Sequence, residues 1–349
     1  MSLTPKALNY RMPPEWDTHS GTLLSWPVNP DTWPGGKLAK VEKVYTDIIR
    51  ALAEFENIHL IVHDHATYQR AKASIRGDFF SDHAVTYHFC PSNDVWTRDF
   101  GPIYIKKETG EVAITNWDYN AWGEKYPPYD SDNKIPEYFA EKFNIKSFKP
   151  GMVLEGGSIE TNGAGVMLTT ESVLLNPNRN PDYSKDDIEG YLKSYLGQDH
   201  FIWLKAGLAG DDTDGHIDDL ARFVSENTIV AAVSDQLDDI NYEVLQQNYE
   251  ILKSAKNAKG NNFEVIFVPM PLCKVDEPTV DGSEYVPASY TNFYIANHVV
   301  LLPLYDERFD DTMIQLFKRL FPDRKVIGIP CSDLVWGQGS IHCITQQMY

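Results

Sequence analysis

The chain ends in GSIHCITQQMY, residues 339–349, and this stretch decides the fold. It predicts a β-strand with no strand after it, so the partner of this strand must lie earlier in the sequence. The apolar segment GTLLSWP, residues 21–27, is the expected partner. Pairing of the two would join the ends of the chain and close the structure into a ring, as radial repeats do to remove sheet edges.

Four earlier stretches predict the same local pattern of strand, turn and strand. Together with the last strand they make five related stretches, and a repeat of this size indicates one structural unit used several times. We therefore expect the repeats to converge on one axis, with the chemistry at the centre. The four stretches are RDFGPIYIKKETGEVAITNW (98–117), EGGSIETNGAGVMLTTESVLLN (155–176), GHIDDLARFVSENTIVAAV (215–233) and ASYTNFYIANHVVLLPLY (288–305).

Helices are expected between these strands, which makes the chain an α/β protein. The segment 37–55 has apolar residues at helical spacing, and 58–64 predicts a further strand. Three of the other helices have candidate N-cap residues, Ser184, Asn241 and Asp310. No low-complexity linker divides the sequence, so we expect one domain over residues 1–349. The other helices are expected near 132–143, 184–196, 242–257 and 310–320.

The charge is strongly acidic, with 31 Lys and Arg against 50 Asp and Glu and a net charge of −19. Nucleic acid and anionic membrane surfaces are therefore unexpected partners, because their phosphates require basic residues. A negative field suits a small cationic substrate, although solubility alone also explains it. The sequence leaves open whether the protein forms a homo-oligomer.

The cysteines predict a reduced, cytoplasmic protein. They are scattered, with no C-x-x-C pair, which argues against a disulfide framework or a cysteine zinc site. The N-terminal sequence has no apolar core of a secretory signal. No run of about 18 apolar residues is present, so no membrane span is expected. The four cysteines are Cys90, Cys273, Cys331 and Cys343.

Cys343 raises the question of a nucleophile, with His342 beside it as an apparent base. In a strand, neighbouring side chains point to opposite faces, so His342 would face away from Cys343. A free cysteine is usually a small buried hydrophobic residue. The glycines of GQGSIHC favour a functional role, because glycine permits close backbone approach to a ligand.

The segment GDDTDGHIDD, residues 210–219, is rich in carboxylates around one histidine. His216 and Asp218 are two residues apart and would share a face of a strand, where they could act as general base and cation clamp. A solvated acidic loop is the alternative. The spacing does not fit a calcium loop of the EF-hand type, but another kind of metal site stays open.

Two further motifs supply carboxylates near the predicted repeat starts. In NDVWTRDFGP, residues 93–102, Asp99 and Trp96 could frame a planar cation, or form a surface ion pair and a core aromatic. In LEGGSIETNGAG, residues 154–165, Glu155 could orient the histidine or serve a turn. The glycine spacing matches no phosphate-binding loop.

Together these residues suit one substrate group, a guanidinium. Carboxylates bind its N–H groups in bidentate fashion. A thiolate can attack its central carbon, and a histidine can protonate the departing ammonia and then activate water. The sequence therefore predicts deimination through a covalent cysteine intermediate.

At these motifs the chain resembles the guanidine-modifying superfamily, and within it the agmatine deiminases and bacterial peptidylarginine deiminases. The resemblance implies a five-bladed α/β propeller of ββαβ units, the pentein fold, which agrees with the predicted ring. The chain departs from the agmatine deiminase pattern at two places. It has GQGSIHC where those enzymes often have GGGNIHC, and it has the compact segment KYPPYD where a longer loop is found. The matching motifs are NDVWTRDFGP, DYNAWGEKYPPYD, LEGGSIETNGAG, LLNPNRNP, GDDTDGHIDDLARF, PASYTNFYIAN and GSIHCITQQ, with MPPEWDTHSGTLLSWP at the N-terminal end.

The resemblance also implies roles for individual residues. The nucleophile is expected to be Cys343 and the general acid/base His216. No metal or organic cofactor is implied. The remaining assignments are Asp99 and Asp218 as guanidinium-binding carboxylates, Glu155 orienting His216, and Trp96, Asp212, Trp122 and Asn292 in the substrate pocket.

Agmatine is the expected substrate, with N-carbamoylputrescine, a putrescine precursor, and ammonia as products. Agmatine has no carboxylate, whereas free arginine would need a basic partner, and the motifs offer only Arg98 and Arg222. Peptidylarginine or another guanidino compound is the alternative within the family. A non-catalytic polyamine- or metal-binding protein is the alternative from another class. A papain-like protease fits poorly, because the histidine here precedes the cysteine.

Overall fold

The computed structural model describes residues 3–75, 84–271, 273, 279 and 282–349, and these form a mixed α/β structure. Within these ranges the strands make five separate sheets. The first sheet has the order β16 (Gln346–Met348), β1 (Gly21–Ser25), β2 (Asn57–Val62), β3 (Val85–Phe89). The others are β4 (Ile103–Lys106), β5 (Val112–Thr115), β6 (Lys146–Phe148); β7 (Glu160–Thr161), β8 (Val166–Thr170), β9 (His200–Leu204); β10 (Ala221–Ser225), β11 (Thr228–Val233), β12 (Glu264–Pro269); and β13 (Tyr294–Ala296), β14 (Val299–Leu304), β15 (Lys325–Pro330).

All five sheets contain the same three-stranded arrangement, and the first sheet adds β3, parallel to β2. An antiparallel pair is followed by a third strand that runs parallel to the middle one, as β4, β5 and β6 do. The four predicted strand–turn–strand stretches are confirmed as the antiparallel pairs β4–β5, β7–β8, β10–β11 and β13–β14. The repeat seen in the sequence is therefore a repeat of strand pairing.

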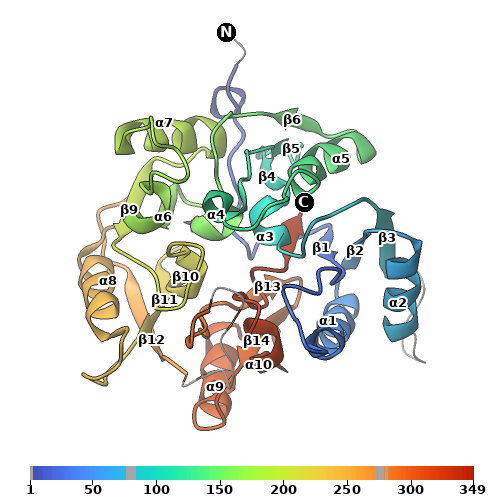
Figure 1. Ribbon diagram of the computed structural model, residues 1–349. Helices are drawn as coiled ribbons and strands as arrows, with labels where there is room; N and C mark the ends of the chain where they lie inside the picture. The colour runs from blue at the N-terminus through green and yellow to red at the C-terminus, as the bar shows by residue number, and fades with distance from the viewer. Residues whose placement is uncertain (1–2, 76–83, 272, 274–278, 280–281) are drawn as a thin grey trace.

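The predicted pairing of the two chain ends is also confirmed. Strand β16 runs antiparallel to β1, with Gly21 opposite Met348 and Leu23 opposite Gln346. These ends supply the antiparallel pair of the first sheet, which takes its parallel strand, β2, from the same N-terminal region. Figure 1 shows the five sheets arranged around a common centre, with the blue strand β1 next to the red C-terminal segment.

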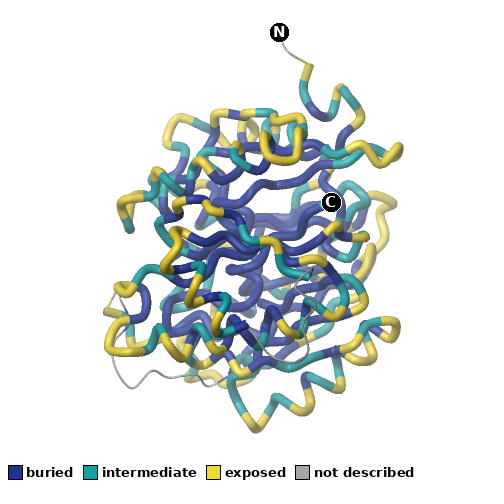
Figure 2. The backbone as a smooth tube through the Cα atoms, turned by 90° about the vertical axis from the view of Figure 1, so that its right-hand side faces the viewer, coloured by how far each residue is buried: buried dark blue, intermediate teal, exposed yellow. Residues whose placement is uncertain are grey.

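The longer helices lie around the outside of this arrangement (Figure 1). Figure 2 shows the consequence for burial, since buried segments run through the middle and exposed ones lie at the periphery. Long helices are α1 (Lys37–Ala53), α2 (His65–Ile75), α5 (Ile135–Lys142), α7 (Lys185–Leu196), α8 (Tyr242–Ser254) and α9 (Asp310–Leu320). Short ones are α3 (Thr97–Phe100), α4 (Ala121–Glu124), α6 (Glu171–Leu174) and α10 (Ser332–Val335).

The five expected helices are present. Of the three predicted N-cap residues, Ser184 and Asn241 occupy the N-cap position, and only Ser184 caps its helix with its side chain. Ser184 forms a capping box with Asp187 at the start of α7. Asn241 makes no side-chain cap and instead accepts a hydrogen bond from the Ala209 N–H. Asp310 is the first residue of α9 rather than its cap. The Asn241 amide and the Asp310 carboxylate therefore accept hydrogen bonds from neighbouring loops instead.

The end of the chain differs from the prediction in one respect. Strand β16 covers only Gln346–Met348, and residues 341–344 form a turn before it. His216 also lies outside a strand, immediately before the 3₁₀ helix Ile217–Asp219. The alternation argument therefore does not apply to His342 and Cys343, or to His216 and Asp218.

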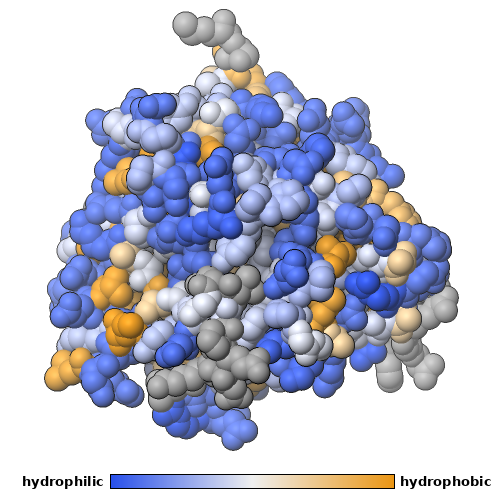
Figure 3. Space-filling view, in the orientation of Figure 1, coloured by the Kyte–Doolittle hydropathy of each residue, from blue (hydrophilic) through white to orange (hydrophobic). Residues whose placement is uncertain are grey.

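None of the helices in the described ranges has both the length and the apolar character needed to cross a membrane. The face in Figure 3 is mostly hydrophilic, with small apolar patches separated by polar residues.

Candidate active site

A cavity of about 650 Å³ brings together several of the predicted site residues. Cys343 and Asp99 line it, together with the pocket candidates Trp96, Trp122 and Asp212. His216, Asp218, Glu155 and Asn292 are buried and do not line it. The predicted residues therefore divide into those on the cavity wall and those packed directly behind it.

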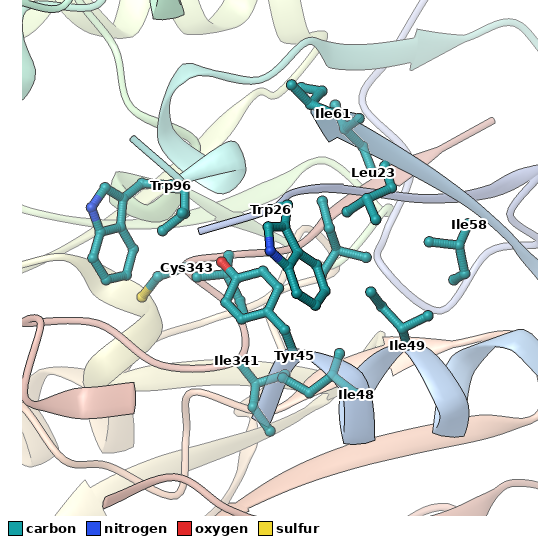
Figure 4. Packing of buried hydrophobic residues seen from close by; sticks show 14 of the residues in the cluster. Leu23, Trp26, Tyr45, Ile48, Ile49, Ile58, Ile61, Trp96, Ile341 and Cys343 are labelled. Atoms are coloured by element: carbon teal, nitrogen blue, oxygen red, sulfur yellow. The ribbon is translucent and has the colours of Figure 1, made fainter. Parts of the chain in front are cut away.

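Cys343 lies where the hydrophobic core meets this cavity. Figure 4 shows its sulfur on the side of Trp96, at the edge of a cluster that includes Trp26 and Ile341. A Cβ atom at Gly339 would lie 2.3 Å from Cζ3 of Trp96, so only glycine lets the turn pass this close to the indole. The glycine-rich approach to Cys343 thus serves packing against Trp96.

The thiol of Cys343 is held in acidic surroundings. The Asn292 Nδ2 lies 3.2 Å from its sulfur and also donates to Asp219 Oδ1 at 2.8 Å. Burial raises the pKa of Cys343 well above its usual value, and Asp218 and Asp219 raise it further. Burial and these carboxylates therefore favour the protonated thiol.

His342 is not available as a base for Cys343, as expected, but for a different reason. Its Nδ1 lies 2.6 Å from Asp218 Oδ2, and its Nε2 lies 2.8 Å from Glu15 Oε2. Both ring nitrogens are thus engaged by carboxylates. Burial, with Arg222 and Arg98, lowers the pKa of this histidine.

Asp99 is presented to the cavity by the short helix α3. Its Oδ1 accepts from the Gly157 N–H at 2.9 Å, and its Oδ2 accepts from Trp122 Nε1 at 3.0 Å. Burial raises the pKa of Asp99 to about 6, against the lowering effect of His216. The neighbouring Arg98 turns to Glu15 and Gln347 instead.

His216 is close to Asp99 because Gly157 has no side chain. The His216 Nδ1 is 3.7 Å from Asp99 Oδ1, and a Cβ at Gly157 would lie 2.5 Å from that nitrogen. Within the described chain the buried Nε2 of His216 has no hydrogen-bond partner. Burial lowers the pKa of His216, but Asp99, Asp218 and Glu155 outweigh it, so the pKa is raised. The imidazole is suited to hold a proton.

Asp218 has one oxygen engaged and one without a partner. Its Oδ2 bonds His342, whereas no described residue bonds its buried Oδ1. Burial would raise the pKa of Asp218, yet the hydrogen bond and charge of His342 keep it below its usual value. The oxygen Oδ1 is therefore available near Cys343, whose sulfur lies 3.9 Å from the other oxygen, Oδ2.

Glu155 does not orient His216 by a hydrogen bond, contrary to the expectation. Its Oε1 accepts from Arg179 Nε at 2.6 Å, and its buried Oε2 is unbonded in the described structure. Arg179 in turn binds Asp214 at 2.6 Å. Glu155 acts on His216 through its charge.

The segment before the Pro-rich stretch has an unusual backbone. Residues 121–124 all have positive φ angles, including 57° at Trp122. Such angles are rare for residues other than glycine, and here they direct the Trp122 indole toward Asp99. The adjacent Tyr126 hydroxyl donates to Asp212 Oδ2 at 2.6 Å, on the cavity wall.

One group of side chains could in principle hold a metal ion. Asp218, Asp219 and Cys343 place one ligand atom each within 4.8 Å of one another. The two carboxylates are already hydrogen-bonded to His342 and Asn292, and the set mixes hard oxygen with soft sulfur. The arrangement fits a guanidinium better than a metal ion.

Several buried residues had no predicted role. Glu15, His342, Arg179 and Asp219 each contact a predicted site residue or its partner. All four stand inside the matching motifs, but only Asp219, within an acidic cluster, carried a sequence signal. The pairings Glu15–His342 and Arg179–Glu155 span distant segments and are visible only in the structure.

The fold and site define a guanidine-modifying type of protein. The chain belongs to the Porphyromonas-type peptidyl-arginine deiminase family, whose sequence model matches residues 11–348. A protein of Legionella pneumophila (strain Paris) named "Putative agmatine deiminase" is 37% identical over 352 residues, which cover 99% of this chain and 97% of that protein.

Solved structures of similar proteins match over the whole chain. The agmatine deiminase of Enterococcus faecalis is 31% identical, with a TM-score of 0.92 and coverage of 100% of this chain and 98% of that one. A Cys-to-Ser variant of the C. jejuni agmatine deiminase, solved with substrate bound, is 31% identical, with a TM-score of 0.86 and coverage of 97% and 96%.

Proposed function

We propose that this protein is an agmatine deiminase, which hydrolyses agmatine to N-carbamoylputrescine and ammonia. One observation carries the proposal. In the described chain, the buried polar atoms without hydrogen-bond partners include Asp218 Oδ1, His216 Nε2 and Glu155 Oε2, and the first two belong to residues around Cys343 and Asp99. Buried polar atoms without partners are costly, so their retention indicates a bound polar ligand.

The proposed reaction uses Cys343 as nucleophile and His216 as general acid and base. The thiolate attacks the guanidinium carbon and forms an S–C bond. The C–N bond then breaks as His216 gives its proton to the departing nitrogen, which leaves as ammonia. Water adds to the amidino carbon, His216 takes its proton, and the C–S bond breaks to give the ureido product and the thiolate. No cofactor enters this sequence.

Substrate binding would also activate the thiol. The carboxylates that raise the pKa of Cys343 are those proposed to bind the guanidinium, Asp218 and Asp99. A cation placed between them cancels their effect, lowers the thiol pKa and lets the proton leave to solvent. Asn292, predicted as a pocket residue, is then proposed to position the sulfur.

The cavity supports a substrate with two positive charges and no carboxylate. Arg98 and Arg222 cannot bind a substrate carboxylate, because both are buried and paired with Glu15. Of the described lysines and arginines that line the cavity, Lys125 binds Asp214 and Arg70 binds Glu42. The wall instead includes the acidic residues Asp94 and Asp212.

The arrangement of the sheets supports a finer description of the fold. We propose that the five sheets are the blades of one α/β propeller of ββαβ units, with residues 1–349 as one catalytic unit. The common topology of the sheets and the β1–β16 pairing support this. The acidic charge and the four free cysteines support a cytoplasmic enzyme that does not bind nucleic acid.

Product analysis with agmatine, free arginine and a blocked arginyl peptide tests the substrate. We expect ammonia and the ureido product from agmatine, with little turnover of the other two. Equal or better turnover of the peptide would overturn agmatine in favour of peptidylarginine. If no guanidino compound releases ammonia, the protein is a binding module. Activity that requires a divalent metal would favour the acidic cluster as a metal site.

A further inference from the structure

We propose that His342 is a positioning residue, which fixes Asp218 for guanidinium binding by sharing two protons with Asp218 and Glu15. The inference rests on the proposed function. It assigns a role to His342, the residue beside Cys343 that was not expected to act as its base.

The proton count follows from the two contacts of His342. The N···O distances of 2.6 Å to Asp218 and 2.8 Å to Glu15 are hydrogen-bond distances, and each requires one proton. Carboxylates and an unprotonated ring nitrogen are only acceptors. Glu15, His342 and Asp218 therefore hold two protons together. Burial raises the pKa of Glu15, but Arg222 and His342 hold it well below its usual value, and the pKa of Asp218 is lowered too. The two contacts therefore place both protons on the imidazole, against the effect of burial and the two arginines.

The geometry divides the two oxygens of Asp218 between two tasks. His342 holds Oδ2, which stops rotation of the carboxylate. The buried Oδ1 is left without a described partner and can accept from a guanidinium. Without His342 the carboxylate would lose its fixed orientation and a hydrogen bond that stabilises its charge.

The other end of the imidazole is anchored firmly. Glu15 accepts from Arg98 Nη2 at 3.1 Å, from Arg222 Nη2 at 2.8 Å and from the Ile295 N–H at 2.8 Å. All of these side chains are buried. The N-terminal segment thereby holds a residue near the C-terminus, 327 positions later, in one orientation.

The charge of Asp218 depends on its whole surroundings. His216 and Arg222 favour its ionised form along with His342, whereas nearby acidic groups oppose it. Removal of His342 should therefore shift the protonation of Asp218 to higher pH. The groups that face or influence Asp218 are His342, His216, Arg222, Asp99, Asp211, Asp219 and Cys343.

The test uses His342→Gln, with His19→Gln as a matched control. His19 is a buried histidine whose Nε2 lies 2.6 Å from the Glu15 backbone oxygen, and its contacts lie with Glu15, Glu56 and Tyr294 rather than with Asp218. In a Cys343→Ser background, calorimetry gives the Kd for agmatine without turnover. In the otherwise unchanged enzyme, kcat and KM are measured from pH 5 to 9.

We expect His342→Gln to weaken agmatine binding about tenfold or more, since hydrogen bonds to charged groups have effects of this size. The acid limb of kcat/KM should move to higher pH, and His19→Gln should show neither change. Unchanged Kd and pH profile in His342→Gln, with an active wild type, would overturn the positioning role and leave the proposed function intact. An inactive wild type would instead overturn the proposed function.

A second measurement applies if His342→Gln does not fold. In Cys343→Ser protein with ¹⁵N-labelled histidine, the Nδ1 resonance of His342 should shift when agmatine is added, because Asp218 is shared between them. A resonance that stays in place while agmatine binds would contradict the proposal.

Discussion

His216 and His342 are both buried, and both act on Asp218, yet they differ in one respect. The Nε2 of His216 has no partner among the described residues, whereas both nitrogens of His342 are bonded to carboxylates. An imidazole with one unbonded nitrogen can exchange a proton with a ligand. An imidazole with both nitrogens bonded to protein groups can only hold those groups in place. Burial beside carboxylates alone therefore does not identify a general base; the state of each nitrogen does.

The largest effect on activity should come from replacing the proposed nucleophile, Cys343. Cys343→Ser should lower kcat by about 10⁴-fold or more, as loss of a nucleophile does elsewhere, while agmatine still binds. Cys331→Ser is the matched control, because Cys331 is buried and does not line the cavity. Steady-state ammonia release measures both, and substantial activity in Cys343→Ser would contradict the nucleophile assignment.

The comparison itself is tested by the two histidine variants. His216→Ala should lower kcat by about 10²- to 10⁴-fold, the range for lost acid–base catalysis, with a smaller change in KM. His342→Gln should act mainly on binding. If the kcat and KM effects of the two variants were the same, the distinction drawn from their nitrogens would be wrong.

The pH dependence should sharpen the role of the carboxylates. Asp99 must be ionised to bind a guanidinium, and its pKa is raised to about 6. The ratio kcat/KM should therefore fall as the pH drops through about 6. A profile that stays flat well below this value, while circular dichroism shows a folded protein, would exclude Asp99 as a binding carboxylate.

The smallest effect is expected at Trp122. Trp122→Phe removes the hydrogen bond to Asp99 and should reduce kcat/KM about tenfold or less, moving the acid limb to higher pH. Trp117→Phe is the control, because the Trp117 N–H binds Thr115 instead. Equal effects of the two changes would show that Trp122 serves packing only.

The fold was largely predictable from the sequence because its determinants are local patterns. Each antiparallel pair has its own strand–turn–strand signal, and the strand at the end of the chain required a partner, which proved to be β1. The N-cap at Ser184 was equally local. The short turn at 341–344 was missed, since its apolar and small residues are also typical of a strand.

The site was predictable in its residues but not in its connections. Cys343, Asp99 and Trp96 lie on the cavity as expected. The bridge from Glu15 through His342 to Asp218 joins segments far apart in the sequence. The positive φ angles at 121–124 have no sequence signal either, because three of the four residues are not glycine.

The most direct test of the central claim is the mass of His216→Ala after mixing with agmatine and quenching with acid. Loss of the general acid/base should slow both formation of the covalent intermediate and its hydrolysis, so the mixture is sampled over a long incubation before quenching. We predict an adduct on Cys343 with the mass of agmatine less ammonia, located by peptide mapping. No adduct on Cys343, together with no ammonia from the wild-type protein, would contradict the account.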